Sequence, residues 1–63
     1  MDRKTAMDCI VGKTHVVNRD IEYYPIAYIL RLHKSKCRHE LELHDLKVNS
    51  VTVANMEEVR LKE

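Results

Sequence analysis

Hydrophobic and polar residues alternate along the middle of the chain. The segment "HELELHD" (39–45) puts its two leucines on one side and its two glutamates on the other. Upstream, "AYILRLH" (27–33) puts Tyr28, Leu30 and Leu32 on one side. A period of two is typical of a strand with one buried face. We therefore predict a long bent hairpin in which residues 21–33 pair with residues 37–46.

The register of this hairpin follows from its leucines, which must all face one core. That condition predicts a turn centred on Ser35-Lys36. The resulting pairs are Leu30 with Leu41, Tyr28 with Leu43, and Arg31 with Glu40. The last pair joins opposite charges, which is worth about 0.2–1 kcal/mol across two strands.

Stretches rich in β-branched residues predict further strands on either side. Upstream, "IVGKTHVV" favours a hairpin that turns at Gly12-Lys13, since Gly-x loops suit type II′ turns. Downstream, the chain turns at Asn49-Ser50 and continues as a strand with Val51 and Val53 facing inward. Pro25 cannot donate a ladder hydrogen bond, so it predicts an edge, a bulge or a bend in the long strand.

The two ends of the chain carry weaker patterns. We predict that residues 1–7 form a flexible arm, which is loose or weakly helical. Residues 8–63 are then expected to form a single small β domain. Asn55 either caps one helical turn or leads into a last strand, "EVRL".

The prediction is a mostly β fold of about five short strands, a small antiparallel barrel or curled sheet of the SH3-like kind. The alternative is a β-meander completed by dimerisation.

The strand through "YYPIAYI" is apolar on both sides. In a regular strand, its odd-numbered residues from Ile21 to Ile29 share one side, and its even-numbered residues from Tyr24 to Leu32 share the other. One side supplies the core, and the other needs cover from the N-terminal arm, a second copy or a partner. The predicted protein interface consists of Tyr23, Tyr24, Ile26 and Ile29.

The basic tip of the hairpin supports an alternative function. Lys and Arg side chains release counterions when they bind phosphates, and the tyrosines offer stacking faces for bases. This alternative nucleic-acid site consists of Arg31, Lys34, Lys36 and Arg38. The net charge of +1, from 11 basic and 10 acidic residues, produces no global field for nucleic acid.

Three histidines and a cysteine gather near the tip, namely His33, Cys37, His39 and His44. Their spacing matches no standard zinc pattern. The predicted hairpin puts Cys37 and His39 on the leucine face and the other two on the opposite face, so we expect no metal and no cofactor.

"GKT" (12–14) lacks the earlier glycine of a P-loop. The possible Cys–His pairs lack an orienting third group, so we expect no enzyme.

The length of 63 residues allows one domain with a small core. Chains of this size often gain burial by oligomerising, which favours a homo-oligomer. Without a long apolar run or a secretory signal, we expect a cytoplasmic protein with reduced cysteines and no membrane contact. Such chains are common in bacteria and phages. We expect a small interaction module or regulator that associates with itself through strand 23–30, binds a larger protein, or both.

Overall fold

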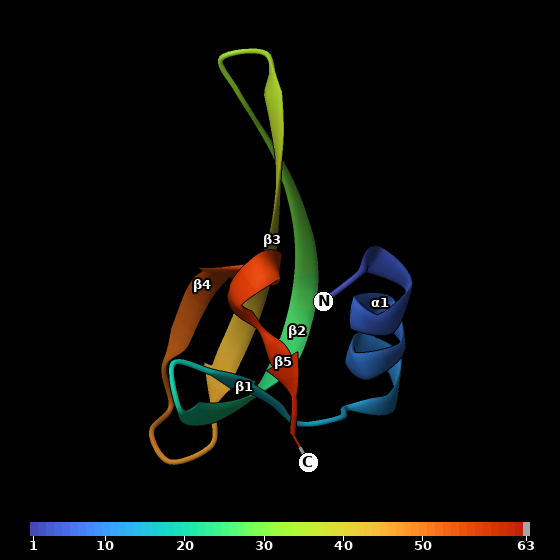
Figure 1. Ribbon diagram of the computed structural model, residues 1–63. Helices are drawn as coiled ribbons and strands as arrows, with labels where there is room; N and C mark the ends of the chain where they lie inside the picture. Colours follow the sequence, from blue (N-terminus) through green and yellow to red (C-terminus); the bar gives the residue numbers. More distant parts are fainter. Residues whose placement is uncertain (63) are drawn as a thin grey trace.

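The computed structural model describes residues 1–62, and all statements below refer to those residues. Along the chain lie α1 (Arg3–Gly12), β1 (Val16–Asn18), β2 (Ile21–His33), β3 (Lys36–Asp45), β4 (Val51–Asn55), the 3-10 turn η1 (Met56–Glu58) and β5 (Arg60–Leu61) (Figure 1). The strands form one antiparallel sheet in the order β4-β3-β2-β1-β5. The predicted mostly β fold of five antiparallel strands is confirmed. In the described part of the chain, β4 and β5 are free edges, so the sheet is not closed into a barrel.

A helix, α1, occupies most of the predicted arm and the first strand of the hairpin predicted for residues 10–17, whereas Val16 and Val17 do lie in a strand, β1. Asp2 caps it, because the Asp2 side chain accepts a hydrogen bond from the backbone nitrogen of Thr5 at 2.7 Å. Ala6 and Cys9, three positions apart, place small buried side chains on the face toward the sheet. The hairpin turn predicted at Gly12-Lys13 was wrong, because Gly12 is the last residue of α1. The glycine suggested a hairpin turn, whereas Asp2 is the N-cap that starts a helix. The helix also crosses the boundary predicted between residues 7 and 8.

The core lies between α1 and one face of the curled sheet (Figure 1). Its buried residues come from both, and also from η1 and the residue after it. They are Ala6, Cys9, Val16, Tyr23, Leu41, Leu43, Ala54, Met56 and Val59. Leu41 and Leu43 are completely buried, so the leucine face predicted for β3 is the core face.

β2 and β3 pair about a two-residue turn at Lys34 and Ser35, whose φ angles of 48° and 64° are those of a type I′ turn. The predicted register was wrong by two residues. Leu30 lies opposite His39 and not Leu41, and Arg31 lies opposite Arg38. A shift of two residues leaves every side chain on its own face, so alternation alone cannot separate the two registers.

A β-bulge interrupts β2 immediately after Pro25, which confirms the irregularity predicted from that proline. Pro25 lies opposite Leu43 while Ala27 lies opposite Glu42, so Ile26 is an extra residue on β2. The bulge moves all later residues of β2 to the other side. Tyr23 and Pro25 therefore share the core face with Tyr28, and the predicted division into odd and even residues was wrong beyond residue 25.

The C-terminal segment contains both of the elements that the sequence offered as alternatives. Asn55 caps η1, since its side-chain oxygen accepts a hydrogen bond from the backbone nitrogen of Glu57 at 3.0 Å. β5 then pairs with β1. In β4, Ala54 lies opposite Leu41 on the core face, so the prediction that Val51 and Val53 face inward was wrong. Within the described residues, neither α1 nor η1 has the length and apolar character needed to cross a membrane.

Candidate functional site

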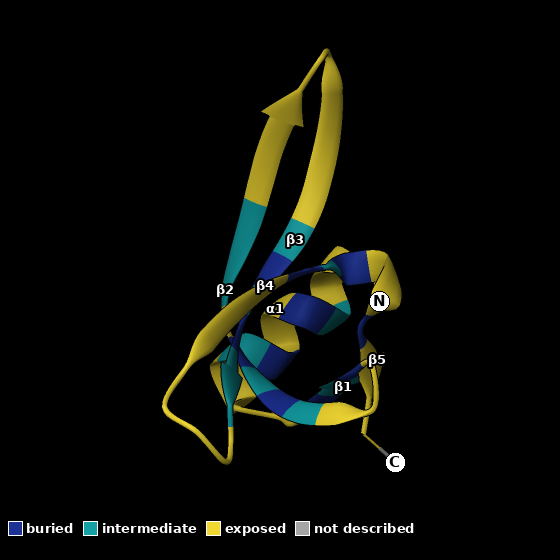
Figure 2. Ribbon diagram, turned by 90° about the vertical axis from the view of Figure 1, so that its left-hand side faces the viewer, coloured by how far each residue is buried: buried dark blue, intermediate teal, exposed yellow. Residues whose placement is uncertain are grey.

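The distal part of the β2–β3 hairpin projects from the body of the molecule (Figure 2). We call residues 30–39 the hairpin arm, and every one of them is exposed. Within the described chain, β1 pairs with β2 only as far as Tyr23, and β4 pairs with β3 only between Glu40 and His44. The hairpin arm is therefore a two-stranded ribbon with two free edges. Such ribbons are marginally stable in water without further packing.

The two faces of the hairpin arm differ in chemistry, because residues opposite each other in the register share a face. The cationic face carries Arg31, His33, Lys36 and Arg38. The apolar face carries Leu30, Leu32, Cys37 and His39. The predicted placement of Cys37 and His39 on the leucine face is confirmed. A surface hollow of about 360 Å³ at the tip is lined by His33, Lys34, Lys36, Cys37 and Arg38.

On the cationic face, two cations, Arg31 and Arg38, lie directly opposite one another, and His33 lies opposite Lys36. The Nε of Arg31 donates to the Oε1 of Glu40 at 3.0 Å, so the predicted contact between these residues exists as a diagonal pair. Among the ion pairs of the described residues, this is the one that involves the hairpin arm.

Charge is segregated between the hairpin arm and the rest of the chain. The arm holds four of the 11 Lys and Arg residues and none of the 10 Asp and Glu residues. The rest of the chain therefore has seven basic against ten acidic residues, a net charge of −3. The predicted nucleic-acid residues Arg31, Lys34, Lys36 and Arg38 all lie on the arm, three of them on its cationic face.

The apolar face of the hairpin arm continues the core face of the sheet. Tyr28 lies opposite the buried Leu41, next to Leu30. The Tyr28 ring is held at the base of the arm, where its hydroxyl shares a hydrogen bond with His39 Nδ1 and the Arg3 guanidinium lies 5.6 Å from the ring centroid. Beyond this point Leu30 and Leu32 are 57% and 73% exposed.

The four residues predicted as a protein interface are divided by the fold. Tyr23 is buried in the core, at 8% exposure. Tyr24 is half-buried and its ring stacks on His44, with centroids 4.9 Å apart. Ile26 is the bulge residue and 40% exposed, and Ile29 is half-buried on the outer face. The β3 residues of this outer face are polar, namely Glu40, Glu42 and His44, and they separate the apolar residues of β2 from those of β4.

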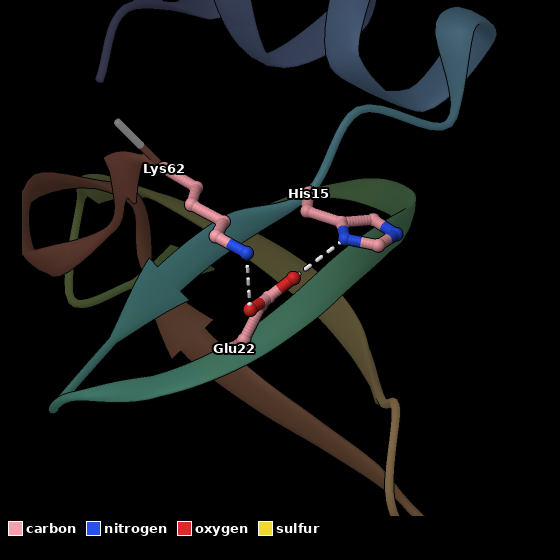
Figure 3. Close-up of polar contacts among 3 residues, drawn as sticks. All are labelled: His15, Glu22 and Lys62. Carbon is pink, nitrogen blue, oxygen red and sulfur yellow. Dashed lines mark hydrogen bonds and ion pairs between the residues drawn. The ribbon is translucent and has the colours of Figure 1, made fainter.

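A polar cluster at the other end of the sheet joins the C-terminal segment to β2 (Figure 3). Glu22 Oε2 lies 2.6 Å from His15 Nδ1, and Glu22 Oε1 lies 2.9 Å from Lys62 Nζ. The hydrogen bond with Lys62 has the largest effect on the pKa of the Glu22 carboxyl, which it lowers, and the hydrogen bond with His15 lowers this pKa further. His15 precedes β1, Glu22 lies in β2, and Lys62 follows β5. The cluster therefore links the end of the short edge strand β5 to β2 across β1.

The two cysteines are free thiols in different environments. Cys9 lies on the buried face of α1, and this burial raises the pKa of its thiol. Cys37 is exposed on the hairpin arm. In the described residues, no group of three or more His, Cys, Asp and Glu side chains is placed to hold a metal ion.

Leu30 and Leu32 are the site residues that sequence reasoning missed, because their alternation assigned them to the core. Strand length was the available signal: β2 has 13 residues, whereas β1 and β4 have three and five and cannot flank all of it.

Comparison of this chain with protein-family models, curated proteins and solved structures finds no match.

Proposed function

We propose that this chain is a small non-enzymatic protein-interaction module that docks through the hairpin arm, and that a second copy of the chain occupies the apolar face. The observation that carries this proposal is the exposure of Leu30 and Leu32 on a ribbon with two free edges. A partner that covers these leucines gains buried apolar area and stabilises a marginal ribbon. As part of the same proposal we regard the curled sheet as SH3-like, a scaffold type that hosts many unrelated functions.

A second copy fits the apolar face for two reasons. The face is continuous with the core at Tyr28 and Leu41, so two copies related by a two-fold axis extend both cores into one layer. The like charges of the two arms also stay apart, because the cationic faces then point away from each other. The contact is small beside the roughly 1,200 Å² of stable interfaces, so we expect weak, concentration-dependent association.

Sedimentation velocity of the full chain over a range of concentrations tests this proposal. We expect the mean mass to rise toward that of a dimer with concentration. The paired substitution Leu30→Asn and Leu32→Asn removes the association, because buried amides would be left without partners. The control is Leu46→Asn, the same change at a leucine that is 40% exposed and lies off the arm, and it leaves the association intact.

Two results would overturn the proposal. The first is a wild-type chain that stays monomeric at about 1 mM, where even contacts worth about 4 kcal/mol are populated. The second is an association that survives the double substitution on the arm but is lost in Leu46→Asn. Circular dichroism spectra of the variants at low concentration show whether each has kept its fold.

A further inference from the structure

We propose that the cationic face of the hairpin arm binds the phosphodiester backbone of a nucleic acid. This function goes beyond the proposed protein contact and uses the opposite face of the ribbon. The binding residues are the two cross-strand pairs Arg31–Arg38 and His33–Lys36, together with Lys34 at the turn.

The cross-strand pairs are the first argument. Arg31 and Arg38 are cations at opposite positions, where Cβ atoms lie within about 5.5 Å of each other and like charges destabilise the pairing. Among the described residues, the Glu40 side chain accepts a hydrogen bond from Arg31 and from no other side chain. In the described residues, Lys34, Lys36 and Arg38 take part in no ion pair. Anions placed between these side chains would replace repulsion with attraction.

The shape of the arm is the second argument. A two-stranded ribbon with both edges free fits the major groove of DNA, which is about 12 Å wide. The tip also has a surface hollow of about 360 Å³ whose lining includes Lys34, Lys36 and Arg38. The net charge of −3 on the rest of the chain repels a polyanion, so contact is confined to the arm.

The separation of the two faces favours nucleic acid over a membrane. A membrane-surface element needs its apolar and cationic residues to reach the lipid together. On this arm Leu30 and Leu32 point away from Arg31 and Lys36, so the cationic face binds without burying leucine. DNA and RNA offer the same phosphodiester chemistry, and the experiment distinguishes between them.

Fluorescence anisotropy with the full chain tests this proposal, using a labelled DNA duplex and a labelled single-stranded RNA of the same length as probes. Four neutralised phosphates predict a slope of log K against log salt near −3.6 for the duplex and −2.8 for the single strand, at about 0.9 and 0.7 per phosphate. Between about 50 and 200 mM salt the affinity for the duplex should fall roughly 150-fold. The tighter probe shows whether the arm prefers duplex DNA or single-stranded RNA.

The variants localise the contact. Lys34→Gln with Lys36→Gln should reduce the slope for duplex DNA by about 1.8, since two cations are lost. The matched control, Lys13→Gln with Lys47→Gln, removes two exposed lysines that lie off the arm and should leave the slope unchanged. Leu30→Asn with Leu32→Asn should also keep the binding, so this proposal can fail or succeed independently of self-association.

Three results would overturn the inference. One is the absence of binding to either probe at about 20 mM salt, where counterion release is most favourable. Another is an equal loss of affinity in the two double-lysine variants. The third is equal binding of polyglutamate or of phosphatidylglycerol vesicles at the same salt concentration, which would assign the face to an acidic protein or a membrane instead.

Discussion

The comparison of Leu32→Ala with Leu41→Ala tests the division of the hairpin into a packed base and an unpacked arm. Both leucines lie on the same face of the β2–β3 hairpin, and the substitution is the same. They differ in burial, because Leu41 is completely buried in the core whereas Leu32 is 73% exposed. The two variants therefore remove the same atoms from two different environments.

The expected losses of stability follow from this difference. Leu41→Ala removes a core side chain and leaves a cavity, which costs about 2.7–5 kcal/mol. At 0.05–0.15 kcal/mol per residue, a chain of 63 residues has a free energy of unfolding of roughly 3–9 kcal/mol, so most of it can be lost. Leu32 buries about a quarter of its surface, which is worth roughly 0.5 kcal/mol. At about 4–8 °C per kcal/mol, the Tm should fall by at least ~10 °C for Leu41→Ala and by ~2–4 °C for Leu32→Ala.

Thermal and urea unfolding, followed by far-ultraviolet circular dichroism at low micromolar protein, measure both losses. At this concentration a weak dimer is dissociated, so each value refers to the monomer. Losses of equal size would refute the reasoning, because they would mean that the arm is packed within a single copy. If the loss for Leu32→Ala grows with protein concentration while that for Leu41→Ala does not, a second copy covers the arm.

Substitutions at three further residues test local features. Ser35→Gly should raise the free energy of unfolding by about 0.5–1 kcal/mol, since glycine adopts a φ of 64° without the strain that serine carries; an unchanged or lower Tm contradicts this. Asn55→Ala should lower stability to urea by about 1 kcal/mol through loss of the cap on η1, and Asn55→Asp should retain most of it; an equal loss in both contradicts the capping role. Glu22→Gln should lower the Tm at neutral pH, because the carboxylate is bonded to Lys62 and His15. The folded state lowers the Glu22 pKa, so this stabilisation is complete above the ordinary value of 4.5 and is lost as pH falls through the folded pKa. The Tm difference between Glu22→Gln and the wild type should therefore shrink as the pH falls below the ordinary pKa of a glutamate, and a difference that is the same at every acidic pH contradicts the assignment.

Alternation in the sequence was sufficient for the faces of β3 and for the core position of Leu41 and Leu43, because a strand that is buried on one side must repeat with a period of two. An irregularity at Pro25 and a cap at Asn55 were among the alternatives that the sequence offered, since each depends on the chemistry of one residue. The cationic tip of the hairpin could be found in the same way. The register could not, because a shift of two residues keeps the same faces.

Only the tertiary structure decided which apolar residues are covered. The bulge at Ile26 put Tyr28, Leu30 and Leu32 on the same face as Tyr23 and Pro25. The short strands β1 and β4 do not extend far enough to bring Leu30 and Leu32 into the core. Burial depends on the neighbours that the fold brings together, whereas alternation depends only on the geometry of one strand. The sequence by itself therefore determined an amphipathic hairpin with a basic tip. The fold determined that the outer half of this hairpin stands alone, with leucines on one face and cations on the other.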